Sequence, residues 1–363
     1  MKKIVGIIAA LAMAGAVFAA DFSAGVRLQG SLFNFGADKT IKLFEEHFEN
    51  QFYQAPISFA FADDEAGGQL KMSAVTTNAV TADAWSIWFK PADILKVTVG
   101  RWSTNLNQEH IGWCNTDSGI ETDGYALTLA TEGFSWDIFL ASGNGKSFFT
   151  KADGGDAAVR ELYTKVQYGA DFGTVNAFFN AAPEYGTNAD GSLNKDVIAK
   201  SFKNMRFGAG INLSGLPVGL WFNFIGTYAG DAFQRIRAEA DVSTTFGSIG
   251  WELFLAAGYD MKAGTQAYND VFTGVEGWHV GGTYYRAEPA AFCGFYTRFN
   301  IPGDGMNFYV EIKDSDVLAK DFSMTLKPGL TKNFGCCAFE MAIDATLAKK
   351  VAIDVPVNFK VNF

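Results

Sequence analysis

The stretch VAIDVPVNFKVNF, residues 351–363, ends the chain and decides its fold. Every second residue from Val351 to Phe363 is Val, Ile or Phe, and the residues between them are mostly polar. Successive side chains of a β-strand point to opposite faces, so a period of two indicates a strand with one apolar face. We therefore predict a strand here. Pro356 falls on its polar face, and because proline has no N–H to donate, we expect a bulge beside it.

This last strand resembles the C-terminal signal strand of outer-membrane β-barrel proteins, which ends on an aromatic residue. The resemblance rests on Phe359, Val361 and Phe363. It implies that the barrel-assembly machinery of the outer membrane recognises this end of the chain.

The first residues have the composition of a secretory signal peptide. Lys2 and Lys3 precede an apolar run, and small or branched residues occupy the cleavage site at the end of residues 1–19. The run is shorter than the roughly 20 residues that a membrane-spanning helix needs. We expect export through the inner membrane, cleavage of this segment, and a single barrel domain over residues 20–363.

The composition favours a barrel in a membrane. The chain has 34 Phe and 48% hydrophobic residues, yet no other run is long enough for a membrane-spanning helix. A closed antiparallel barrel then satisfies the backbone hydrogen bonds in lipid, and outer-membrane lipid is the expected surrounding. Loss of Lys2 and Lys3 would lower the formal net charge from -10 to -12, which argues against nucleic acid as a partner.

Short alternating segments fill the chain and predict an all-β, transmembrane antiparallel barrel of 16–18 strands. One predicted wall strand spans Trp278–Tyr285. Tight turns near Pro91, Thr131, Gly169, Ser214, Gly247 and Glu288 alternate with long polar stretches at residues 102–120, 142–157, 182–202 and 259–275. Short periplasmic turns and long extracellular loops are typical of such barrels.

Residues 39–52 depart from the alternation. Ile41, Phe44, Phe48 and Phe52 recur at helical spacing, which predicts a short amphipathic helix at the barrel rim or in its mouth. The alternative is a surface loop.

The polar face of the predicted strands favours a water-filled pore over a packed barrel. Arg235, Arg237, Glu239 and Asp241 share one face of a single strand. A dry interior would not accommodate such a set, because each unpaired buried charge costs several kcal/mol. A barrel of this strand number is wide enough to hold water.

A second prediction concerns Val99-Gly100-Arg101 and the long loop that follows. This arrangement resembles the strand and the inward-folded loop that narrow the channel of general porins. It implies a transverse field across the lumen, which would sort solutes by charge. The residues that would line this constriction are Arg101, Glu109, His110, Asp117, Arg235, Arg237, Glu239 and Asp241. The alternative is that the loop lies outside the barrel, as most long loops do.

Catalysis has little support in the sequence. The three histidines, His47, His110 and His279, lie in no metal-binding spacing, and no nucleophile motif is present. The four cysteines also lack a zinc or redox spacing. We therefore predict no catalytic residue, no bound metal and no cofactor.

The predicted function is passive diffusion of ions and small hydrophilic solutes through a porin. The negative net charge of the chain favours a mild preference for cations over anions. The alternatives left open are an adhesin or receptor built from the long loops, and a substrate-specific transporter plugged by residues 39–52. A homotrimer is compatible with each of them.

Overall fold

The protein is described here by a computed structural model. It covers residues 20–45, 55–75, 79–104, 120–141, 161–184, 201–229, 232–261, 264–268, 282–286, 289–314, 316–320 and 323–362. Within these ranges every regular element is a β-strand. No helix in them is long and apolar enough to span a membrane.

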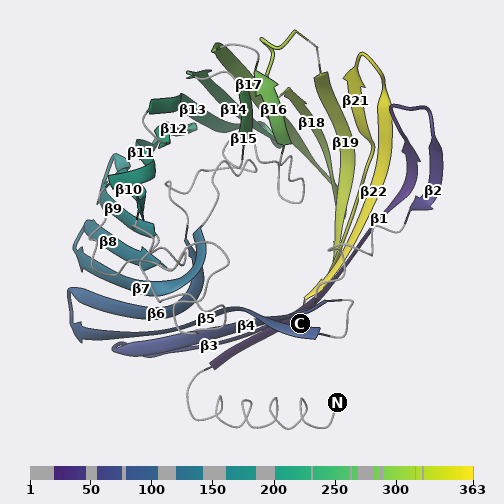
Figure 1. Ribbon diagram of the computed structural model, residues 1–363. Coiled ribbons are helices and arrows are strands. Elements are labelled where there is room, and N and C mark those ends of the chain that lie inside the picture. Colours follow the sequence, from purple (N-terminus) through teal and green to yellow (C-terminus); the bar gives the residue numbers. More distant parts are fainter. Residues whose placement is uncertain are drawn as a thin grey trace, which may run out of the picture.

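Twenty strands form one antiparallel sheet that closes into a ring (Figure 1). The first half of the sheet comprises β1 (Ala20–Phe35), β2 (Ile41–Glu45), β3 (Ala55–Ala62), β4 (Ala66–Val75), β5 (Ala79–Ala92), β6 (Leu95–Thr104), β7 (Ile120–Thr131), β8 (Phe134–Ala141), β9 (Glu161–Ala170) and β10 (Gly173–Glu184). The second half comprises β11 (Ser201–Leu213), β12 (Gly219–Ala229), β13 (Ala232–Phe246), β14 (Ile249–Asp260), β17 (Ala290–Gly303), β18 (Met306–Asp314), β19 (Ser323–Phe334), β20 (Cys337–Ala342), β21 (Asp344–Ala348) and β22 (Ala352–Asn362).

The ring closes between its two ends in the sequence. β1 pairs with β22 from Gly25 opposite Asn362 onward, and its first residues pair with β3. The alternating C-terminal stretch forms a strand, as predicted, and the structure shows that this strand completes the wall.

The 20 strands make 18 passes around the ring. β2 and β3 pair with different parts of β1, and together they form its neighbour. β20 and β21 both pair with β19 and β22, and only Ile343 separates them. When β2 and β3 are counted as one pass, and β20 and β21 as another, the 20 strands make 18 passes. This number is the upper end of the predicted range.

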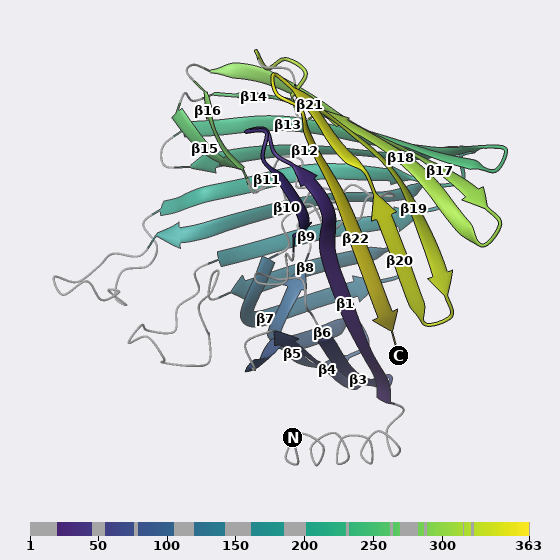
Figure 2. The same cartoon turned by 90° about the vertical axis from the view of Figure 1, so that its right-hand side faces the viewer.

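Connection lengths segregate between the two ends of the barrel. At one end, tight turns of two to five residues join β5 to β6, β7 to β8 and β13 to β14. Figure 2 shows two further tight hairpins, β17–β18 and β19–β20, on its right-hand side. The longest connections follow β6, β8, β10 and β14 and leave from the other end. This is the layout that the sequence predicted.

Two predicted elements are wrong. The apolar residues of 39–52 predicted a helix, but Ile41–Glu45 is strand β2, where Ile41 and Leu43 alternate with Lys42; residues 46–52 lie outside the described ranges. The described part of the predicted strand Trp278–Tyr285 is not in the wall, because β14 pairs directly with β17. Instead β16 (Gly282–Arg286) pairs with β15 (Gly264–Tyr268) in a separate hairpin. The turn predicted at Glu288 also lies outside the described residues.

The bulge expected beside Pro356 is confirmed. Pairing between β1 and β22 shifts between Ser31, which lies opposite Pro356, and Asn34, which lies opposite Asp354. Ser31 Oγ and Asn34 Nδ2 both donate to Asp354 Oδ1. Polar side chains thus hold the two strands together where the proline contributes no ladder donor.

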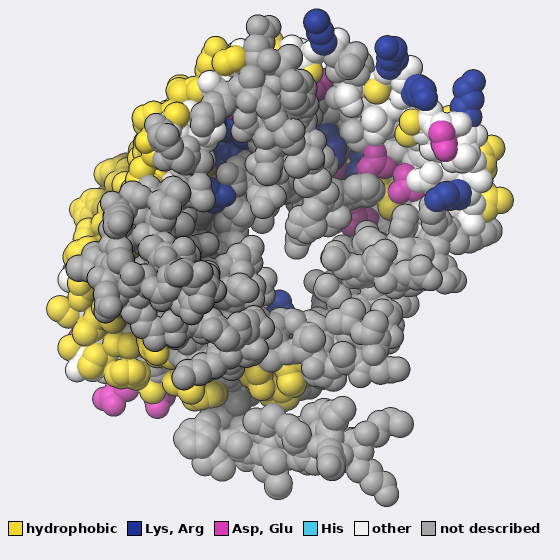
Figure 3. Space-filling view, in the orientation of Figure 1, with side chains coloured by type: hydrophobic (Ala, Val, Ile, Leu, Met, Phe, Trp, Pro, Cys, Tyr) yellow, Lys and Arg dark blue, Asp and Glu magenta, His cyan; other side chains and the backbone are white. Residues whose placement is uncertain are grey.

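The two faces of the wall differ in chemistry. Large apolar side chains such as Ile87, Phe89, Leu127, Phe224 and Leu255 are exposed on the outside. Figure 3 shows hydrophobic side chains along the left-hand outer edge of the ring and charged side chains on its inner side, with further Lys and Arg side chains at the rim on the upper right. An apolar outer face and a charged inner face are what a barrel in lipid requires.

Candidate pore lining

The four charged residues of β13 lie on one face of the strand and are buried. Arg237 is 2% exposed and Asp241 is 0% exposed, while Arg235 and Glu239 are nearly as covered. Strand alternation places Arg235, Arg237, Glu239 and Asp241 together, because each is two residues from the next. Burial of four charges on one strand demands partners for them.

Ion pairs supply partners for three of these residues, Arg235, Arg237 and Glu239. Arg235 Nε lies 2.6 Å from Asp260 Oδ1 on β14, directly across the ladder. Arg237 Nε lies 2.7 Å from Glu239 Oε1 on its own strand. Asn223 Nδ2 on β12 donates to Glu239 Oε2 at 3.2 Å. Charge on β13 is therefore linked to both neighbouring strands.

A second set of charges runs across the strands rather than along one. Glu252 on β14 lies opposite Arg298 on β17, Arg298 lies opposite Glu311 on β18, and Glu311 lies opposite Lys327 on β19. We call these four residues the charged row. Their signs alternate, so every directly opposite pair is attractive.

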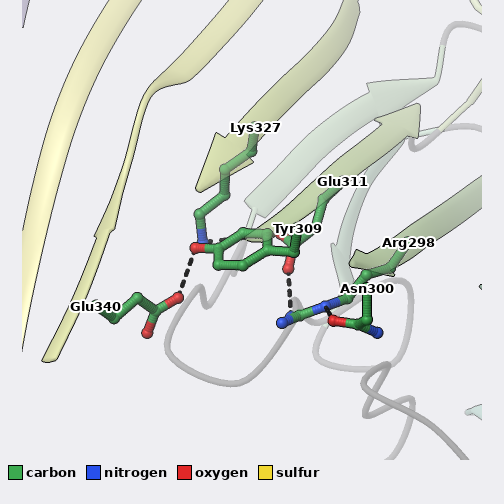
Figure 4. A network of polar contacts seen from close by, with 6 residues as sticks. All are labelled: Arg298, Asn300, Tyr309, Glu311, Lys327 and Glu340. Atoms are coloured by element: carbon green, nitrogen blue, oxygen red, sulfur yellow. Dashed lines mark hydrogen bonds and ion pairs between the residues drawn. The ribbon is translucent and has the colours of Figure 1, made fainter. Parts of the chain in front are cut away.

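Ion pairs join three of the four residues of the charged row, Arg298, Glu311 and Lys327 (Figure 4). Arg298 Nη1 lies 2.7 Å from Glu311 Oε1, and Lys327 Nζ lies 3.7 Å from Glu311 Oε2. Arg298 Nε donates to Asn300 Oδ1 at 2.8 Å, so the guanidinium is fixed from two sides.

Tyr309 packs beneath the charged row. The Arg298 guanidinium lies 4.3 Å from the centre of its ring, a distance suited to a cation–π contact. The Tyr309 hydroxyl donates to Glu340 Oε1 on β20 at 2.6 Å. This network spans four consecutive strands of the wall and has several fixed charges on the lumen side.

A different lining covers the inner wall from β8 to β12. Phe139, Tyr163, Phe178 and Ile225 form a buried cluster, with Ala126 packed against it; we call it the aromatic cluster. Phe178, Gly208, Ile225 and Arg237 lie opposite one another on β10 to β13. The aromatic cluster is therefore on the same face as the charges of β13.

Gly208 makes room for this cluster. A Cβ atom at Gly208 would lie 2.5 Å from the Phe178 ring and 2.3 Å from the carbonyl oxygen of Phe224. Both distances are below van der Waals contact, so the ring lies against bare backbone.

The other residues predicted to line the constriction do not belong to the buried charges or to the aromatic cluster described above. Arg101 on β6 lies opposite Trp85 and Asp123. It shares a strand face with Val97 and Val99, whereas Lys96 lies on the other face. Its place at a constriction therefore stays a prediction. Glu109, His110 and Asp117 lie outside the described residues, as do His47 and His279.

The sequence missed Arg298, Tyr309, Lys327 and the aromatic cluster. Charged residues at alternate positions were visible in each strand, but the pairing between strands was not. Among the described residues, no group of three or more His, Cys, Asp or Glu side chains is arranged to hold a metal ion.

The buried charges of the described wall are mostly acidic. Four are cationic, namely Arg235, Arg237, Arg298 and Lys327. Seven are anionic, namely Glu239, Asp241, Glu252, Asp260, Glu311, Asp314 and Asp344.

Solved outer-membrane porins of Pseudomonas aeruginosa resemble this barrel over 95% of its chain. OpdL matches with a TM-score of 0.56 at 11% identity, over 95% of this chain and 98% of that chain. OpdK with vanillate matches with a TM-score of 0.57 at 7% identity, over 95% and 98%. OccK2 (OpdF) in complex with glucuronate matches with a TM-score of 0.55 at 11% identity, over the same shares.

The chain has the fold of an outer-membrane porin. At these identities the likeness extends to the fold alone. The sequence matches no protein-family model, and it matches no curated protein.

Proposed function

We propose that this protein is an outer-membrane porin through which ions and small hydrophilic solutes diffuse passively. One observation carries the proposal: a closed ring of 18 strand passes, apolar outside, places buried ion pairs on its inner face. A wall of this circumference encloses a lumen wide enough for water. The porin fold of the solved structures supports the same conclusion.

The charge of the wall supports a mild preference for cations. Six of the buried carboxylates share the inner face with the four buried cations, whereas Asp314 lies opposite Phe295 and has the register of the outer face. Fixed negative charge raises the local concentration of cations and lowers that of anions. Arg235 and Arg237 would then act as local anion contacts within an acidic surrounding, and carboxylates of the loop after β6 would complete a transverse field.

The proposal includes the route to the membrane. Residues 1–19 would be removed during export, and the end of β22 would be recognised by the barrel-assembly machinery. Phe359 and Val361 lie in β22, opposite Phe339 and Cys337 of β20, while Phe363 is outside the described residues. A homotrimer remains part of the prediction.

The aromatic cluster favours a second candidate, a substrate-selective channel. OpdK is seen with vanillate and OccK2 (OpdF) with glucuronate, and both ligands carry a carboxylate. In this chain Ile225 of the aromatic cluster lies directly opposite Arg237. An apolar surface beside a cation would retain a small solute that has a ring and a carboxylate.

Single-channel recording in a planar bilayer tests the proposed function. Refolded residues 20–363 should give discrete conductance steps in potassium chloride. A substrate-selective channel would in addition show a concentration-dependent block by vanillate or glucuronate, which a general porin would not. A folded, inserted barrel without conductance steps would contradict both forms of the proposal.

A further inference from the structure

Lysines and exposed aliphatic side chains meet on one side of the barrel rim. The lysines lie in the connections β1–β2, β18–β19 and β21–β22, all at the end with the longest loops. Lys and Arg side chains gather at the upper right of Figure 3, where β2, β19 and β21 lie. We define the rim patch as Lys39, Lys320, Lys349 and Lys350, together with Ile41, Leu43, Val317, Leu318 and Val351.

The three connections are neighbours in the wall. Ser323 at the start of β19 lies opposite Ala348 at the end of β21, and Phe35 at the end of β1 lies opposite Ile353 of β22. Hydrogen bonds from Thr40 lower the pKa of Asp38, and the nearby charge of Lys350 contributes to the shift. The lysines thus form one surface although they are distant in the sequence.

The aliphatic members of the rim patch are among the most exposed apolar residues in the described chain. Ile41 and Leu43 are each 64% exposed and Leu318 is 58% exposed. Val317 and Val351 are also exposed. Apolar side chains beside cationic ones fit the boundary between the acyl chains and the head groups of a bilayer.

Lys39 has an unusual backbone conformation for its residue type. Its φ is 68°, in the left-handed region that favours glycine or asparagine. Hydrogen bonds stabilise the turn that contains Lys39. Lys39 N donates to Gly36 O at 2.8 Å, and Thr40 N donates to Asp38 Oδ1 at 3.0 Å. This conformation makes Lys39 a position at which a role of the side chain beyond the turn can be tested.

We propose that the rim patch binds a phosphorylated lipid in the leaflet around the long-loop end. Its phosphates would lie against the four lysines, and its acyl chains against the aliphatic side chains. The inference rests on the proposed membrane location. Charge complementarity carries it, because phosphates pair with clustered lysines near a membrane surface.

The described parts of these three connections contain two carboxylates, Asp38 and Asp316. Asp38 accepts hydrogen bonds from Thr40 N and Thr40 Oγ1. Asp316 accepts from Cys293 N and Leu318 N. Both carboxylates are therefore engaged by their own loops.

The opposite rim has the reverse charge. Its tight turns carry exposed carboxylates, and these are Asp63, Asp64, Glu65, Asp93, Glu132, Asp171 and Asp304. Such turns would repel phosphates. The barrel therefore distinguishes its two ends by charge, and the proposed lipid site belongs to one of them.

The test uses the mature protein and native mass spectrometry of lipid retained after detergent extraction. The probes are diphosphorylated lipid A and the same lipid with its phosphates removed, each in phosphatidylcholine vesicles. The variant Lys349→Gln/Lys350→Gln should lose about 30-fold in affinity for the phosphorylated lipid, since each lysine near an anionic surface contributes about fivefold. The matched control Lys90→Gln/Lys332→Gln removes the same charge near the tight-turn end and should leave binding unchanged.

A third variant separates binding from folding. Lys39→Gly removes one charge and relieves the left-handed strain, so the barrel should remain at least as stable while affinity falls about fivefold. Equal binding of the two lipids, or equal losses in the rim-patch variant and the control, would overturn the proposal. If the lipid test fails but the unmodified protein conducts in a bilayer, only the lipid site is refuted and the proposed porin function stands. If the unmodified protein neither inserts nor conducts, the proposed porin function itself is refuted.

Discussion

The charged row and the aromatic cluster obey the same alternation rule, yet they stabilise the inner wall in different ways. In the charged row, the pairing register places opposite charges side by side, so that Arg298 meets Glu311. In the aromatic cluster, large rings pack against one another and over the bare backbone of Gly208. The comparison shows that two parts of the inward face of this barrel differ in chemistry. One part supplies fixed charge, and the other supplies an apolar contact area beside it.

The largest effect is expected from breaking the charged row. Arg298→Met removes the cation between Glu311 and Asn300 and leaves Glu311 with Lys327 alone, at 3.7 Å. Loss of one partner of a buried ion pair costs about 3–5 kcal/mol. The free energy of unfolding, measured in urea with the barrel in liposomes, should fall by that amount. Arg298→Lys keeps the charge and should cost less; equal losses would mean that geometry rather than charge holds the row.

A somewhat smaller effect is expected in the aromatic cluster. Phe178→Ala leaves a cavity between Tyr163 and Ile225 and should cost about 3 kcal/mol in the same unfolding assay. The reversal potential of the channel should stay unchanged, because no charge is removed. A shift in reversal potential would show that the aromatic cluster also positions the charges of β13.

The smallest effect concerns the space beneath the rings. Gly208→Ala places a Cβ atom 2.5 Å from the Phe178 ring, which should cost about 2 kcal/mol through overpacking. Gly169→Ala is the control, since its nearest atom would lie 3.9 Å away. If the two substitutions had equal effects on the urea midpoint, the close packing of Phe178 on Gly208 would be refuted.

The sequence predicted the wall better than it predicted the lining. The alternation of residues 351–363 and the segregation of turn lengths depend on local spacing, and both are found in the structure. Pairing register depends on which strands become neighbours, so the contact of Arg298 with Lys327 through Glu311 could not be deduced from single strands. Trp278–Tyr285 alternates like a wall strand, but β14 and β17 pair without it.

The aromatic cluster was missed for a related reason. Phe139 and Tyr163 are aromatic, and aromatic residues are also common on the outward face of this chain. Hydrophobicity therefore does not assign a face to them. Their inward position follows from the charged residues two positions away on the same strands, Asp137 and Lys165, which the register places opposite each other.

The reversal potential of single channels under a potassium chloride gradient tests the central claim most directly. A lumen whose wall carries more buried carboxylates than cations should shift that potential toward the value for potassium. Glu252→Gln and Asp241→Asn together should reduce the shift, while Arg237→Gln should increase it. An unshifted or anion-directed potential in the unmodified protein would contradict the claim that wall charge controls passage through this pore.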